Sequence, residues 1–120
     1  MTLSVSTQVN PVATRMASET AAGATANNNV AGGAATIYTL EVDNTGNGSA
    51  VYLKIYQNAA PVVGNTAPDA IIMAPGSTKV SMGFTSGWYF SILSFACVTQ
   101  GGNGGTTAPT NPVPVKILYS

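Results

Sequence analysis

Residues 36–58 carry the clearest pattern of apolar and polar positions in the chain. Two runs rich in β-branched and aromatic residues, 36–43 and 50–58, alternate with a period of two and flank a turn of Asn, Thr, Gly and Ser. If Asp43 faces Ala50, one face of the resulting pair is entirely apolar, and it consists of Tyr38, Leu40, Val42, Val51, Leu53 and Ile55. The sequence therefore predicts a β-hairpin whose apolar face contributes to a core.

The opposite face of this predicted hairpin has mixed polarity. In the same register Glu41 lies opposite Tyr52 and diagonal to Lys54, while Ile37 lies opposite Tyr56. The two tyrosines and Ile37 would form an aromatic and apolar row outside the core. Such a row can be covered by a partner protein, can stack on sugar rings, or can be covered by another segment of the same chain.

Further strands are predicted on both sides of the hairpin. Residues 3–9 alternate apolar and polar, and residues 88–98 are apolar on both faces, as in a strand that is covered twice. The remaining strand patterns occur at 70–74, 78–84 and 113–119, with Gly- and Pro-rich turns between them. About seven strands predict an all-β fold, an antiparallel two-sheet β-sandwich with Ig-like or jelly-roll connections.

Residues 13–35 differ from the rest of the chain because Ala, Gly, Thr, Asn and Ser dominate, and Met16 and Val30 are the only sizeable apolar side chains. A helix over 13–22, with Asn10 as its N-cap, is one interpretation. An extended arm is the other, because a segment with so little apolar area gains little by packing on itself. Such an arm would lie on a neighbouring subunit or on the surface of its own domain.

These patterns divide the chain into an N-terminal strand and extended low-complexity arm at 1–35 and a β-sandwich domain at 36–120. We expect the apolar side chains of the arm and the mixed face of the hairpin to contact other subunits. The candidate subunit interface therefore consists of Met16, Val30, Ile37, Tyr52 and Tyr56.

Composition favours an assembled subunit over a free monomer. The 120 residues suffice for one domain. Charged residues make up only 7% of them, against about 25% in ordinary proteins, so the electrostatic barrier to self-association is weak. The basic residues are scattered, which disfavours nucleic-acid binding. The sequence has neither a secretory signal nor the roughly 18-residue apolar run that a bilayer requires. We therefore expect synthesis in a cytoplasm and no membrane partner.

The side chains that enzymes use are scarce. The chain has no His, and its single Cys97 lies in an apolar strand, where it is expected to behave as a small buried hydrophobe. A Ser-His-Asp triad and a zinc site are excluded by these counts. Glu41 and Asp43 share a strand face and can hold a cation, or Glu41 can pair with Lys54. The glycines of 101–105 lack the lysine of a phosphate-binding loop. We expect a protein that is not an enzyme and needs no cofactor or metal.

Several strand-and-turn motifs between residues 36 and 118 resemble small β-sandwich structural proteins of tailed-bacteriophage virions. Residues 1–35 are not covered by the resemblance. The motifs that carry it are Tyr52-Leu53-Lys54-Ile55-Tyr56, Ala59-Ala60-Pro61, Gly64-Asn65-Thr66-Ala67-Pro68-Asp69, Pro75-Gly76, Gly87, Ala96-Cys97-Val98-Thr99, Gly101-Gly102 and Thr106-Thr107-Ala108-Pro109-Thr110.

This resemblance implies a capsid cement or decoration protein, made in the bacterial host cytoplasm and located on the capsid surface of the virion. Its partners would be the major capsid protein and copies of itself in a homo-oligomer. The resemblance also admits a tail or fibre module. A carbohydrate- or host-surface-binding module of that kind, with Tyr52 and Tyr56 as its stacking platform, is therefore the alternative.

Overall fold

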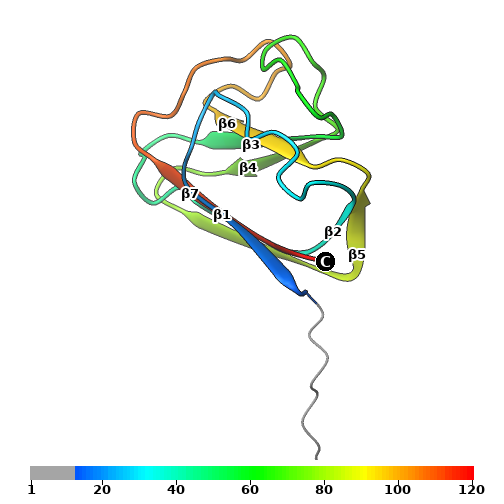
Figure 1. The fold of residues 1–120 in the computed structure, drawn as a ribbon. Helices are drawn as coiled ribbons and strands as arrows, with labels where there is room; N and C mark the ends of the chain where they lie inside the picture. Colours follow the sequence, from blue (N-terminus) through cyan, green and yellow to red (C-terminus); the bar gives the residue numbers. More distant parts are fainter. Residues whose placement is uncertain (1–12) are drawn as a thin grey trace, which may run out of the picture.

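The computed structural model describes residues 13–120, and in that range the fold is all-β with seven strands and no helix. Four strands form one antiparallel sheet in the order β1-β7-β2-β5, and three form a second in the order β4-β3-β6 (Figure 1). The strands are β1 (Arg15–Ala22), β2 (Ala35–Asp43), β3 (Val51–Tyr56), β4 (Ala70–Ala74), β5 (Lys79–Phe90), β6 (Ser94–Val98) and β7 (Val113–Tyr119). The strand predicted at residues 3–9 lies outside the described residues. No membrane-spanning helix is found in residues 13–120.

The two sheets pack face to face around one hydrophobic core, as the two-layer prediction requires (Figure 1). Alternate residues of each strand point inward because successive side chains of a strand lie on opposite faces. The four-stranded sheet contributes Ile37, Leu40, Val42, Val113, Val115 and Ile117, and the three-stranded sheet contributes Val51, Leu53, Ile55, Ile72, Phe95 and Cys97.

The prediction that β2 and β3 pair with each other as a hairpin is wrong. β2 pairs with β5 and β7, whereas β3 pairs with β4 and β6, so the two strands belong to different sheets. The turn at 44–49 crosses from one sheet to the other, and the buried Asn44 amide fixes it by donating to the carbonyls of Ser49, Ala74 and Pro75 at 2.9, 3.1 and 3.0 Å. A period-two pattern specifies which face is buried but not which strand is the neighbour. The two apolar faces therefore face each other across the core.

A β-bulge in β2 reverses the faces predicted for its first half. The register of β2 shifts between Ile37 and Thr39 in its pairing with both neighbours. The extra residue places Ile37 on the same buried face as Leu40, while Tyr38 stays half-buried on the other face. Ile37 is therefore a core residue and is not part of an exposed row.

The segment predicted as one strand over 88–98 contains the end of one strand and the whole of the next. β5 ends at Phe90, a turn follows, and β6 begins at Ser94. β5 also continues through Gly87, where a turn was expected. Gly87 has a φ of 79°, and a Cβ there would overlap Thr36 Cγ2, so glycine alone suits this kink. β6 is buried along its whole length, as predicted for a strand covered on both faces.

Residues 13–35 belong to the same fold, so the predicted boundary at residue 35 does not separate two parts of the structure. β1 pairs with β7, and residues 23–30 then run along β6. Four backbone bonds hold this segment: Cys97 N to Gly23 O at 2.9 Å, Asn27 N to Phe95 O at 2.8 Å, Phe95 N to Asn27 O at 3.1 Å, and Val30 N to Leu93 O at 2.9 Å. The helix considered for 13–22 is wrong, because a strand edge supplies hydrogen bonds that compensate for the small side chains.

Candidate functional site

The mixed face of the predicted hairpin is covered by the chain itself. Ile37 and Tyr56 are fully buried, with 0% of each side chain exposed. Tyr52 is half-buried, and its ring lies against Gly101, where a Cβ would come within 2.9 Å of Cε1. Of the alternatives for this face, cover by another segment of the same chain is the one observed. The tyrosine pair therefore does not form an exposed platform for a sugar or a partner.

The two interface candidates from the N-terminal segment have separate environments. Met16 lies on β1 and is 60% exposed. Val30 is partly buried and packs against the core from the segment that follows β1 and runs along β6. The five predicted interface residues thus do not form one surface, and Met16 is the only one of them that remains a large exposed hydrophobic side chain.

The acidic residues of β2 have local partners. Lys79 Nζ lies 3.4 Å from Glu41 Oε1, so the ion pair predicted between Glu41 and Lys54 is replaced by one within the four-stranded sheet. Asp43 accepts hydrogen bonds from Thr45 Oγ1 at 2.6 Å and Thr45 N at 3.1 Å, and these bonds lower the pKa of its carboxyl. Within residues 13–120 no three His, Cys, Asp or Glu side chains gather as metal ligands would.

Lys54 is buried on the outer face of β3, beneath the loop that follows β6. Its ammonium donates to the carbonyl oxygens of Gly102 and Gly105, which anchors residues 99–107 over the three-stranded sheet. Burial lowers the pKa of Lys54. The neighbouring Tyr56 hydroxyl is also buried, and it has no hydrogen-bond partner within residues 13–120. Burial raises the pKa of Tyr56.

Cys97 is buried in β6, and burial raises the pKa of its thiol to about 12. A thiol of this kind is protonated at neutral pH and does not act as a nucleophile. The prediction that Cys97 is buried is confirmed.

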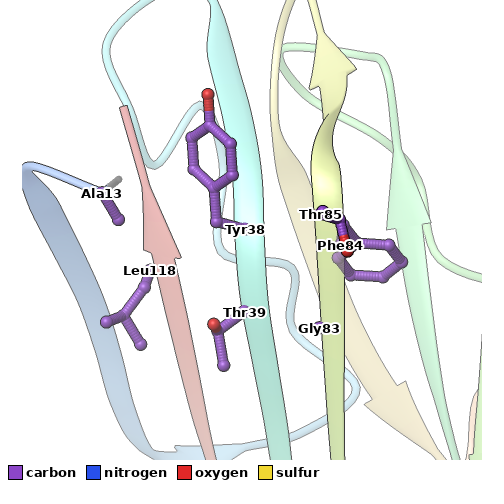
Figure 2. Close-up of a pocket in the computed structure, with 7 residues that line it drawn as sticks. All are labelled: Ala13, Tyr38, Thr39, Gly83, Phe84, Thr85 and Leu118. Carbon is purple, nitrogen blue, oxygen red and sulfur yellow. The ribbon is translucent and has the colours of Figure 1, made fainter. Parts of the chain in front are cut away.

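A shallow groove crosses the outer face of the four-stranded sheet. Figure 2 shows Leu118 on β7 and Tyr38 and Thr39 on β2 on one side of it, and Gly83, Phe84 and Thr85 on β5 on the other; Ala13 completes the lining. The groove has a volume of about 560 Å³. Its lining contains no carboxylate, thiol or cationic side chain, so it offers a contact surface and no acid–base pair.

A second surface lies where the edges of the two sheets meet at β4 and β5, and we call it the open side. A cavity of about 430 Å³ lies between these two strands. Its lining is apolar and consists of Ala70, Ile71, Ile72, Met82, Phe84, Gly87 and Trp88. On β4, Ile71 of this lining and the nearby Met73 are 42% and 51% exposed. The open side thus combines an apolar cavity with two exposed apolar side chains of one strand.

Sequence reasoning did not identify the open side, although part of its signal was present. The β4 pattern is uncharged and apolar at every position, and Val80, Met82 and Phe84 alternate along β5. The first was interpreted only as a short strand, and the second as an inward-facing row. That β4 and β5 are edge strands on the same side of the molecule depends on the strand order, which the periodicity does not contain.

The chain was compared with models of protein families, with curated proteins and with solved structures, and none of them matches.

Proposed function

We propose that this chain is a structural protein of a tailed-bacteriophage virion, a capsid cement protein that binds copies of itself and the major capsid protein. The observation that carries the proposal is the open side, where an apolar cavity and the exposed Ile71 and Met73 accompany two strand edges. Contiguous apolar surface of this kind is typical of protein–protein interfaces. The resemblance of residues 36–118 to virion proteins supplies the kind of assembly.

The mechanism follows from the surface chemistry. With 7% charged residues and a net charge of zero, the chain has little repulsion to overcome when copies come together. Burial of apolar strand surface and backbone hydrogen bonds at sheet edges would hold neighbours together. An Ig-like or a jelly-roll connection of the strands would serve this function equally.

The carbohydrate-binding alternative has no observation in its favour. Its stacking platform required Tyr52 and Tyr56 at the surface, and Tyr56 is fully buried while Tyr52 lies beneath Gly101. We therefore develop only the structural role.

The proposal can be tested on virus particles. Antibodies raised against the recombinant chain should label the capsid shell of phage particles purified from the culture that is the source of the gene. Peptides of the chain should also be detected by mass spectrometry in those particles after density-gradient purification. Absence of the chain from purified particles would contradict the proposal, and labelling of the tail alone would replace the capsid role by a tail role.

A further inference from the structure

The free edge of β4 lacks the features that normally protect a sheet edge. Within residues 13–120, β4 pairs only with β3, and β5 pairs only with β2. The ladder between β3 and β4 runs from Val51–Ala74 to Ile55–Ala70 without a bulge. β4 itself contains no charge and no proline. Native proteins usually protect edges with Lys, Pro or bulges, because an unprotected edge pairs with another chain.

The cavity beside this edge is shaped for alternate side chains of an added strand. A strand placed next to β4 would point every second residue between the sheets, toward Met82, Phe84 and Trp88, which line the cavity from β5. Its other residues would lie beside Ile71 and Met73 on the outer face. In strand addition of this kind, backbone bonds give affinity and the pockets for alternate side chains select the sequence.

Residues 3–9 have the sequence that this edge requires. Leu3, Val5, Thr7 and Val9 would lie on one face of a strand, and Ser4, Ser6 and Gln8 on the other. The segment is uncharged, and Pro11 follows it. It is therefore a strand pattern with apolar residues on one side only, and no strand among residues 13–120 pairs with the outer edge of β4.

The chain between residues 3–9 and β1 is too short for this segment to reach β4 of the same copy. Four steps of extended chain separate Val9 from Ala13, a span of at most about 14 Å. β7 and β2 lie between β1 and β5, which places β5 about 14 Å from β1, and the opposite sheet lies about 10 Å above. The direct line from β1 to β4 is thus about 17 Å and passes through the core, and a path around it is longer. A second copy has no such restriction.

We infer that residues 3–9 of one copy add as a strand to the free edge of β4 of a second copy, with Leu3, Val5 and Val9 in the cavity between β4 and β5. This inference rests on the proposed function in that it names the contact between copies. It makes each chain both donor and acceptor, so copies associate in closed rings or pairs, or in open chains.

Two full-length variants test the two halves of this contact. Val5→Asp places a charge on the inserted face of the donor, and Ile71→Asp places one beside the cavity of the acceptor. Each variant should be monomeric by light scattering at concentrations at which the unaltered chain is oligomeric. Ser6→Asp and Val62→Asp, which put the same charge on the outward face of the donor and on an exposed loop residue, should leave the oligomer unchanged. Circular dichroism checks that all four variants remain folded.

Mixing the variants distinguishes strand exchange from other contacts. The Val5→Asp chain keeps an intact acceptor edge and the Ile71→Asp chain keeps an intact donor, so an equimolar mixture should regain the mass of a heterodimer. A monomeric unaltered chain, unchanged oligomers in both variants, or a mixture that stays monomeric would each overturn the inference.

The virion experiment separates this inference from the proposed function. If the single variants lose association and their mixture recovers it, but virions are not labelled, the inference is supported and the proposed function is contradicted. Labelling of virions, together with association that neither variant changes, would support the proposed function and overturn the inference.

Discussion

The two sides of the molecule differ in how their strand edges are covered. On one side, which we call the closed side, β1 continues into residues 23–30, and this segment bonds to Phe95 and Cys97 of β6 and to Leu93 just before it. On the open side, β4 and β5 have no further strand beside them among residues 13–120. Figure 1 shows the blue segment after β1 rising from the lower sheet to the upper one.

This difference shows that a strand edge can be covered by a segment without large side chains. Residues 23–30 are almost all Gly, Ala, Thr and Asn, yet their backbone groups satisfy the edge of β6. β4, by contrast, is uniformly apolar and carries the exposed Ile71 and Met73. The closed side therefore contributes to the stability of the single chain, and the open side retains surface for association. The predictions below test this division, beginning with the largest effect.

Removal of the largest side chain on the closed side should show most clearly that the two sides contribute differently to the stability of the chain. Phe95 is 2% exposed and lies in the core beneath the 23–30 segment. Phe95→Ala should lower the free energy of unfolding by about 3–5 kcal/mol, because it removes buried ring area and leaves a cavity. Met73→Ala on the open side should change it by no more than about 0.5 kcal/mol. Urea denaturation of the isolated chain measures both, and equal losses would show that the two sides do not differ in this way.

Alkaline titration should report the burial of Cys97 on the closed side. Its folded pKa of about 12 lies above the ordinary 9.0, so the unfolded chain loses this proton first as the pH rises. Stability should therefore fall between pH 9 and 12, by an amount approaching 4 kcal/mol at about 1.36 kcal/mol per pH unit.

The matched control for this titration is Cys97→Ala, which should lose stability at all pH values by removing the sulfur atom but should lack this alkaline component. Denaturation at several pH values gives both profiles. If the 23–30 segment opened readily, the thiol would titrate at its ordinary pKa, and the two profiles would run parallel.

The strands of this fold could be predicted from the sequence more fully than their pairing. The strands at 70–74 and 113–119 match β4 and β7 residue for residue, because their turns are marked by Pro, Gly and Asn. The hairpin failed for a different reason. Val42 and Val51 point into the same core from opposite sheets, and a period-two pattern is the same whether two strands are neighbours in a sheet or face each other across a core.

The candidate site was harder to predict because it depends on exceptions to alternation. The bulge after Ile37 moved that residue into the core, and no residue type in the strand marks its position. Tyr56 is fully buried although its position on β3 was predicted to face away from the core. The open side, in turn, is defined by strand order, so Ile71 was recognised as a strand residue but not as an exposed edge.

The kink of β5 on the open side should tolerate only glycine. Gly87→Ala combines a φ of 79° with an overlap between the new Cβ and Thr36 Cγ2. The expected loss is about 2 kcal/mol from left-handed backbone strain and overpacking. Gly83→Ala in the same strand is the matched control, because no atom lies within 4 Å of its added Cβ and its φ is not positive. Thermal denaturation of both should show a lower midpoint for the Gly87 variant alone, and equal midpoints would mean that the kink relaxes.

A smaller effect, the pH dependence that Lys54 gives to stability, tests whether the 99–107 loop covers the three-stranded sheet as residues 23–30 cover β6. Thr99 N donates to Thr107 O at 2.9 Å, and the Lys54 ammonium holds the same loop through the carbonyls of Gly102 and Gly105. Because burial lowers the pKa of Lys54 from its usual 10.5, the unfolded chain binds this proton more readily in the window below 10.5. Stability should therefore rise as the pH approaches that value from below.

Lys54→Met should abolish this rise, whereas Lys116→Met, which removes an exposed lysine from β7, should preserve it. The measurement is best made in the Cys97→Ala background and below pH 10, because the thiol contributes with the opposite sign above pH 9.0 and burial of the Tyr56 hydroxyl does so above 10.0. A rise that persists in Lys54→Met would come from another group, whereas the absence of a rise in the chain that keeps Lys54 would mean that the loop opens enough to hydrate the ammonium. In that case the three-stranded sheet would be uncovered on its outer face as well as at β4, and the contrast between the two sides would extend to a third surface.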